Sequence, residues 1–177
     1  MKNKTIITLL LSFICFNIFA QEKQVFRGGL GLTMYNPGPY ETSLRVAPSM
    51  YLEYGYRFND YLSATANFSN THATHVEYSS DTRYDLSFRA YVKPFAKKSF
   101  LKRFELGLGL TGEYREISSW NRSHRFEPGI DIPFRFNLIS KNNYELTSFF
   151  DLNTRFDKQN GFDLYYYGGG LLFGVKF

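Results

Sequence analysis

Three histidines, His72, His75 and His124, are the side chains of this sequence that change charge most readily near neutral pH. A histidine can act as a general base beside a hydroxyl group, or it can coordinate a metal ion. His72 and His75 are three residues apart and Glu77 follows them, so three possible metal ligands lie close together in the sequence. A zinc site, however, needs three or four converging ligands. We therefore interpret the histidines as exposed residues in or beside loops, and we predict neither a metal site nor a cofactor.

A second motif, GLGLTG at residues 107–112, satisfies the G-x-G-x-x-G pattern of dinucleotide-binding proteins. That pattern binds a pyrophosphate only where it leaves a strand and opens a helix. Here it lies inside a stretch that alternates between polar and apolar residues, with Glu105 and Glu113 in phase with the first two glycines. We predict instead that Gly107 and Gly109 make space inside a crowded structure.

The composition limits the class of protein further. The chain has 177 residues, of which 19% are aromatic, and such a share of rings excludes a disordered chain. Its length suggests a single domain. One cysteine, Cys15, cannot form a disulfide framework or a cysteine-based zinc site. The mean hydropathy is nevertheless polar, at −0.32, so the arrangement of the rings and the polar residues must explain how they coexist.

The first twenty residues have the order of a secretory signal peptide. Lys2 and Lys4 give a positive start, an apolar stretch follows, and the small residue Ala20 ends it. We expect cleavage after Ala20. A membrane anchor and a lipoprotein processed at Cys15 are the alternatives. Without Lys2 and Lys4, 19 basic and 16 acidic residues remain, and a net charge of +3 is too small to indicate nucleic-acid binding.

From residue 24 onward, apolar and polar residues alternate with a period of two, as where Leu52 and Tyr54 alternate with Glu53 and Gly55. Such alternation is typical of a β-strand with one apolar and one polar face. We predict eight strands, at residues 24–35, 45–58, 61–72, 81–94, 103–115, 125–138, 144–156 and 163–177. The longer connections, predicted as loops at one end of the strands, lie at residues 36–44, 73–80, 116–124 and 157–162.

The size of an eight-stranded barrel decides which face points inward. Eight strands enclose a lumen just wide enough to be filled by side chains. The apolar face, rich in Phe, Tyr and Leu, would overfill that space, whereas the polar face combines small residues with charges of both signs. Charges removed from water must be paired. We therefore predict a charge network in the lumen, formed by Arg45, Glu53, Arg57, Asp81, Arg83, Asp85, Arg89, Glu105, Glu113, Arg115, Arg125, Glu127, Asp131, Arg135, Asp151 and Arg155.

One short connection between predicted strands is strongly basic. It contains or adjoins Lys93, Lys97, Lys98, Lys102 and Arg103. We interpret it as a solvated turn, with anionic lipid head groups as occasional partners.

The predicted signal peptide, the eight long strands and the last segment together resemble the small eight-stranded outer-membrane β-barrel proteins of the OmpA and OmpX type. The last segment has an alternating apolar face and a terminal Phe, which resembles the signal that the barrel assembly machinery recognises. The residues of that signal are Tyr167, Phe173, Val175 and Phe177. For residues 21–177, the resemblance implies an all-β fold: an eight-stranded antiparallel up-and-down transmembrane β-barrel with a charged, filled lumen. It also implies location in a bacterial outer membrane, membrane lipid and the barrel assembly machinery as partners, a monomeric state, and both termini on the periplasmic side.

This resemblance indicates an architecture rather than an activity. With charges inside and no catalytic constellation, we hypothesise a structural, adhesion or envelope-interaction role without an open pore. One alternative is an outer-membrane lipid A-modifying enzyme, since such acyltransferases and deacylases use His with Ser or an acid. The side chains available for that chemistry are Ser69, His72, His75, Ser123 and His124, although residues 69–72 lack the His-x-Ser-Asn order of the deacylases. The other alternative is a secreted, lipocalin-like binder of a small ligand.

Overall fold

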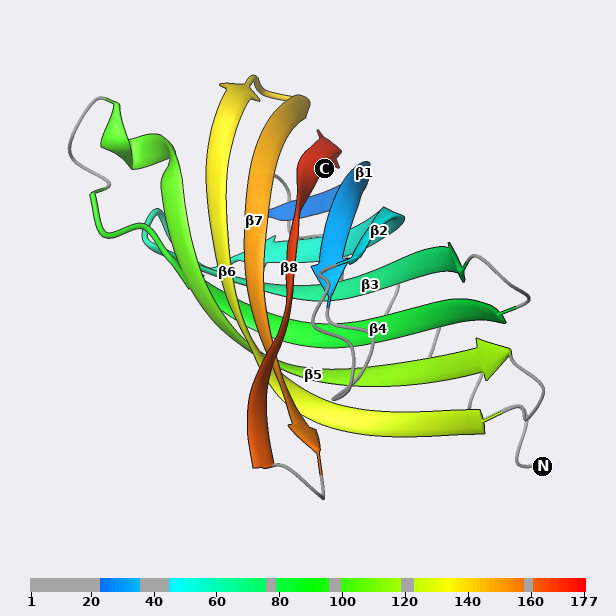
Figure 1. Ribbon diagram of the computed structural model, residues 1–177. Coiled ribbons are helices and arrows are strands. Elements are labelled where there is room, and N and C mark those ends of the chain that lie inside the picture. The colour runs from blue at the N-terminus through cyan, green and yellow to red at the C-terminus, as the bar shows by residue number, and fades with distance from the viewer. Residues whose placement is uncertain (1–22, 36–44, 76–78, 96–99, 119–122, 158–160) are drawn as a thin grey trace, which may run out of the picture.

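The computed structural model describes residues 23–35, 45–75, 79–95, 100–118, 123–157 and 161–177, and nearly all of them lie in eight long β-strands (Figure 1). A single 3-10 turn, η1 (Leu101–Arg103), precedes the fifth strand. Among the described residues, no helix is long and apolar enough to cross a membrane. The strands are β1 (Gln24–Tyr35), β2 (Arg45–Arg57), β3 (Leu62–His75), β4 (Ser79–Val92), β5 (Phe104–Ser118), β6 (Ser123–Ser140), β7 (Tyr144–Asp157) and β8 (Gly161–Lys176).

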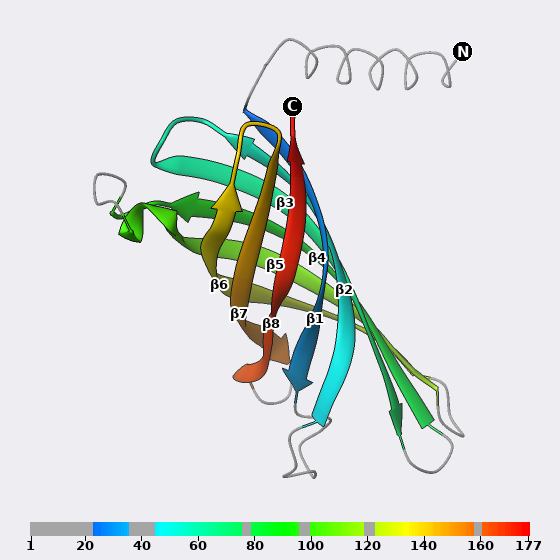
Figure 2. The ribbon, with the colours of Figure 1, turned by 90° about the horizontal axis from the view of Figure 1, so that it is seen from above.

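Each strand pairs with the next in antiparallel orientation, and β8 returns to pair with β1, so the sheet closes into a barrel. The start of β1 and the end of β8 lie side by side in Figure 2, and the main chains of Gln24 and Phe177 exchange hydrogen bonds of 3.1 and 3.3 Å. Closure removes the unpaired edges that an open sheet would expose. The predicted all-β, eight-stranded, up-and-down architecture is thus confirmed.

The strands extend farther than the sequence pattern predicts at the end away from the termini. There β3 runs to His75, β4 begins at Ser79, and β5 and β6 include most of the predicted loop 116–124. Cross-strand pairs such as His72 with Thr82 continue the ladder. The predicted loops 73–80, 116–124 and 157–162 are therefore too long, because backbone pairing does not need the apolar alternation that marks the rest of each strand.

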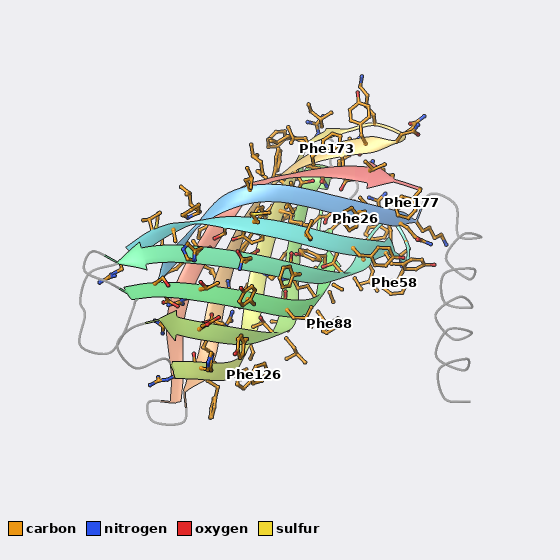
Figure 3. The ribbon with its side chains drawn as sticks, turned by 90° about the vertical axis from the view of Figure 1, so that its right-hand side faces the viewer. Phe26, Phe58, Phe88, Phe126, Phe173 and Phe177 are labelled. Atoms are coloured by element: carbon orange, nitrogen blue, oxygen red, sulfur yellow. The ribbon has the colours of Figure 1, made fainter. Side chains whose placement is uncertain are left out.

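The two faces of the sheet are inverted relative to a soluble protein. Outward side chains form an apolar surface, in which Leu30 is 69% and Leu110 is 71% exposed. Figure 3 shows the labelled phenylalanines, which include Phe88 and Phe126, on the outside of the barrel. Inward side chains are polar, and Arg155 is completely buried. Folding thus buries the charges together and leaves the rings to face an apolar medium.

A small apolar cluster interrupts the polar lumen. It consists of Tyr51, Phe149 and Leu172, with the Tyr51 and Phe149 rings in edge contact at a centroid distance of 4.6 Å. Glycines of β1 and β8 leave room for this cluster. A Cβ atom at Gly31 would lie 3.0 Å from the Tyr51 ring, and one at Gly168 would lie 3.0 Å from the Tyr51 hydroxyl. The seam where the barrel closes is therefore built from small residues that accommodate large side chains of the neighbouring strands β2 and β7.

Replacing Gly31 with valine is expected to lower the free energy of unfolding by about 1–3 kcal/mol, the usual cost of overpacking. A Cβ atom there would also lie 2.4 Å from the Gly169 carbonyl oxygen, which is backbone and cannot swing away. Gly28→Val on the same strand is the matched control, because its Cβ would meet only Leu52, at 3.7 Å. Urea unfolding of the barrel in lipid vesicles measures both, and equal stabilities would contradict the tight packing of the seam.

Candidate functional site in the barrel lumen

Ion pairs fill the lumen near the chain termini. Arg27 of β1 donates to Glu53 of β2 and to Glu145 of β7, and each hydrogen bond is 2.5 Å long. Arg135 of β6 reaches across the barrel to the same Glu53, and Lys176 lies 3.5 Å from Glu145. Every one of these side chains except that of Lys176 is buried. Strands far apart in sequence are therefore held together through the lumen as well as along the sheet.

The middle of the lumen is centred on Arg89 of β4. Its guanidinium lies 3.0 Å from Asp131 and 2.9 Å from Asp151. Two residues farther along β4, the guanidinium of Arg135 stacks over the ring of Tyr91, 3.8 Å from the ring centroid. A cation over a ring face is stabilised by the ring quadrupole. At this level the lumen is occupied by side chains from β4, β6 and β7.

Farther from the termini, Arg155 of β7 is surrounded by three carboxylates. It donates to Asp85, and its other nitrogens lie 3.5 Å from Glu113 and 3.6 Å from Asp131. The side chain has no solvent-exposed area. A cation that is buried this completely needs such partners, since an unpaired buried charge is strongly destabilising.

The last layer before the loops is formed by Asp81 with two arginines. Arg83 and Arg115 approach the same Asp81 oxygen at 3.0 and 2.7 Å. Arg83 also lies 3.6 Å from Glu113, which connects this layer to the one around Arg155. The layers thus follow one another along the barrel axis, and charged side chains fill the lumen.

The structure brings together most of the residues predicted to form the network. The predicted residues that take part in these ion pairs are Glu53, Asp81, Arg83, Asp85, Arg89, Glu105, Glu113, Arg115, Asp131, Arg135, Asp151 and Arg155, with Glu105 paired to Lys93 at 3.1 Å. Glu127 is buried beside Glu113, but its Oε2 atom has no hydrogen-bond partner among the described residues. Arg45 and Arg57 are half-buried at opposite ends of β2.

Arg125 is the correction to the predicted network. Its side chain is exposed near the start of β6, two residues from Ser123, although it continues the inward phase of that strand. Two residues at the terminal end, Arg27 and Glu145, are central to the network but were missed. Both are in phase with inward residues of their own strands, Glu145 with Asp151, so the same rule of alternation applied to every predicted strand would have found them.

Only part of the histidine and serine set that the enzyme alternative would use lies among the described side chains, and its members there are not brought together. Ser69 is buried in the lumen while His72 faces outward, so these two side chains lie on opposite faces of β3. The side chains of His75 and Ser123 are not among the side chains that the structure describes. In the described part of the chain, no three His, Cys, Asp or Glu side chains are placed to hold a metal ion. Residues 107–112 lie within β5 and open no helix, so the nucleotide-binding context is missing.

A different arrangement of polar groups lies on the outward face near the loops. His72, Thr82, Glu116 and His124 are successive neighbours across β3 to β6. The His72 Nδ1 atom is 2.8 Å from the Thr82 hydroxyl, and the His124 Nδ1 atom is 2.9 Å from the Tyr114 hydroxyl. This outer polar row was hidden in the sequence, because its members come from four strands and meet only through the register.

Solved structures with the same architecture allow the fold to be named. Neisserial surface protein A superposes with a TM-score of 0.68 at 14% identity, covering 89% of this chain and 98% of that one. The attachment invasion locus protein Ail of Yersinia pestis gives 0.58 at 13% identity, with 88% and 98% covered. OprG from Pseudomonas aeruginosa gives 0.56 at 10% identity, with 89% and 96% covered. The chain has the fold of the small outer-membrane β-barrels. No family model matches the sequence, and no curated protein matches it.

A small outer-membrane barrel with this surface belongs in a bacterial outer membrane, as predicted. Its apolar side chains face outward over the whole circumference, and its charges are buried. A soluble lipocalin-like barrel would have the opposite arrangement, with an apolar lumen and a polar exterior. The secreted-binder alternative is therefore wrong for this barrel. Phe173, Val175 and Phe177 lie on the exposed outer face and Tyr167 is half-buried, while their role in assembly stays a prediction.

Proposed function

We propose that this small outer-membrane barrel is a closed envelope protein with a structural or surface-interaction role, and not a pore. The observation that carries the proposal is the ion-pair network, in which buried arginines such as Arg89 and Arg155 cross the lumen to carboxylates of other strands. A solute could pass only by displacing these pairs, and separating one buried pair costs about 3–5 kcal/mol.

Single-channel recording in planar lipid bilayers tests the absence of a pore. We expect the folded barrel to insert without the steady conductance steps of a porin. A variant that removes two charges from one layer, Arg89→Ala with Asp151→Ala, is the positive control, since it removes the pair that crosses the middle of the lumen. Porin-like steps from the unmodified barrel would overturn the proposal.

The surface-interaction part of the proposal concerns the end of the barrel away from the termini. Exposed basic groups there include Arg125, with the half-buried Arg45 on β2. Among the barrels of the same fold, Ail has been solved in complex with the heparin analogue sucrose octasulfate. Arginine is well suited to sulfate oxygens, because its guanidinium donates two parallel hydrogen bonds.

Sucrose octasulfate is accordingly the probe for adhesion. We expect it to bind the barrel in detergent micelles, with affinity that falls at least fivefold in the Arg45→Met/Arg125→Met variant and that weakens with added salt. Lys141→Met, in the turn at the other end, is the control with one cation removed. Unchanged binding in the double variant would rule out this surface.

A lipid-modifying enzyme is the second candidate, favoured by the contact between His72 and the Thr82 hydroxyl at 2.8 Å on the lipid-facing side. A histidine beside a hydroxyl is the pair that general-base catalysis requires. Mass spectrometry of lipid A from cells with the wild-type barrel, the His72→Asn variant or no barrel tests this activity. A lipid A species that depends on His72 would support the enzyme, and identical lipid A in all three strains would reject it.

A further inference from the structure

A hollow of about 540 Å³ lies on the outward face of β2 to β6, in the otherwise convex apolar surface. Its floor is formed by three small residues, Ala64, Ala66 and Ala90. Register explains why they adjoin, since Ala64 pairs with Ala90 across β3 and β4, and Ala66 is the next outward residue of β3. Small side chains at adjacent positions leave a depression wherever their neighbours are large.

The walls of the hollow are large apolar and aromatic side chains. Tyr56 and Tyr54 of β2 stand opposite Ala64 and Ala66 on one side. On the other side, Leu108 of β5 pairs with Ala90, and Leu110 follows it along the strand. Both leucines are largely exposed, so the walls project outward from the sheet. The hollow is thus a trough that spans Ala64 and Ala90 between ridges from β2 and β5. At the next ladder position it narrows to Ala66, between Tyr54 and the exposed Phe88.

The hollow lies toward the end of the barrel where β1 begins and β8 ends. Ala90 is two residues from the end of β4, and Ala64 is two residues from the start of β3, which is about 7 Å along an extended strand. The connection that follows β4 and leads into β5 carries Lys102 and Arg103, and both are exposed. This basic edge is therefore at the same end of the barrel as the trough, five residues along the chain from Leu108.

The same end of the barrel contains a basic cavity of about 620 Å³. Its charged lining consists of four cations and one acid, namely Arg57, Lys93, Lys102, Arg103 and Asp60. Lys93 is paired with Glu105, while Lys102 and Arg103 face solvent. A phosphate group close to such a surface is attracted by each nearby Lys or Arg.

We propose that the trough binds one acyl chain of an anionic phospholipid, whose phosphate lies at the basic edge formed by Lys102 and Arg103. The surrounding surface is the lipid-facing band of the barrel, so the medium that reaches the trough is hydrocarbon. An unfilled trough would lose dispersion contacts on one side. An acyl chain fills it, and the charge of the edge selects a negative head group. The proposal goes beyond the closed lumen and the surface-interaction role.

Native mass spectrometry tests it with the full barrel in nanodiscs of equal parts phosphatidylglycerol and phosphatidylcholine. We expect one lipid to remain on each wild-type barrel after release from the disc, with phosphatidylglycerol retained at least fivefold over phosphatidylcholine. Ala64→Leu/Ala66→Leu should reduce retention at least tenfold by filling the trough. Lys102→Gln/Arg103→Gln should keep the lipid but lose most of the head-group preference.

Leu32→Phe is the matched control, because it enlarges an outward side chain on β1, away from the trough. This variant should retain lipid as the wild type does. Equal retention by the wild-type barrel and the Ala64→Leu/Ala66→Leu variant would overturn the proposal. A wild-type barrel that retains no lipid would also overturn the proposal, and this result does not depend on whether any variant folds. A dimer of barrels that disappears in the same variant would overturn it in favour of self-association. None of these outcomes depends on conductance or saccharide binding.

Discussion

Replacing Arg155 with methionine is expected to lower the free energy of unfolding by about 3–5 kcal/mol, the cost of breaking a buried ion pair by removing one partner. The guanidinium of Arg155 is completely buried and lies among Asp85, Glu113 and Asp131. Methionine has a similar length, so the change removes the charge without opening a large cavity. Three carboxylates would then share a buried site with no cation of β7 between them.

Urea titration of the barrel folded in phospholipid vesicles, followed by the gel mobility of unheated samples, measures this loss. Arg125→Met is the matched control, because Arg125 is also a strand arginine in the inward phase but its side chain is exposed. We expect the control to change stability by less than about 0.5 kcal/mol. Equal effects for the two arginines would contradict the pairing of Arg155 in the lumen.

Replacing Leu110 with arginine is expected to destabilise the barrel in a bilayer by about 2–4 kcal/mol, the cost of a basic side chain at the midplane of a membrane barrel. Leu110 lies near the middle of β5 and points outward. On a soluble barrel the same change would place a charge in water at almost no cost. The size of the effect therefore reports the medium that surrounds this face.

Tyr114→Arg is the control for depth, because Tyr114 is outward on the same strand but nearer its loop end. The cost there should fall to about 0–1 kcal/mol, since a long side chain near the interface reaches water. The same vesicle titration measures both variants. Costs that do not differ with depth would show that the band around Leu110 is not in hydrocarbon.

The fold could be predicted from the sequence because two rules apply throughout the chain. Alternation of period two gives each strand and its faces, and the narrow lumen of eight strands decides that the polar face is inside. Arg155, Asp85 and Glu113 were assigned to the lumen by these rules alone. Their partners were not, since Arg155 on β7 meets Asp85 on β4 across the barrel rather than along the sheet.

Two kinds of feature could not be predicted from alternation. Strand ends are one, since Arg125 continues the inward phase of β6 but its side chain is exposed near the start of the strand. Cross-strand register is the other, because pairing His72 with Thr82 and Ala64 with Ala90 requires knowing how β3 and β4 are aligned. The ladder also shifts by one residue on β6 near Leu138, which no local pattern marks. The outer polar row and the trough therefore appear only in three dimensions.

The most direct test of the central claim is covalent labelling of the unmodified barrel in vesicles with a diazirine probe that dissolves in the hydrocarbon phase, mapped by mass spectrometry. Burial predicts label on Leu86, Phe88, Leu108 and Leu110, and none on the intervening inward side chains Ser87, Arg89 and Thr111. A water-soluble radical probe should likewise leave Ser87 and Thr111 unmodified, because the lumen is closed. Diazirine label on the inward set, or modification of Ser87 and Thr111 by the aqueous probe, would contradict a barrel with lipid outside and a sealed network of charges within.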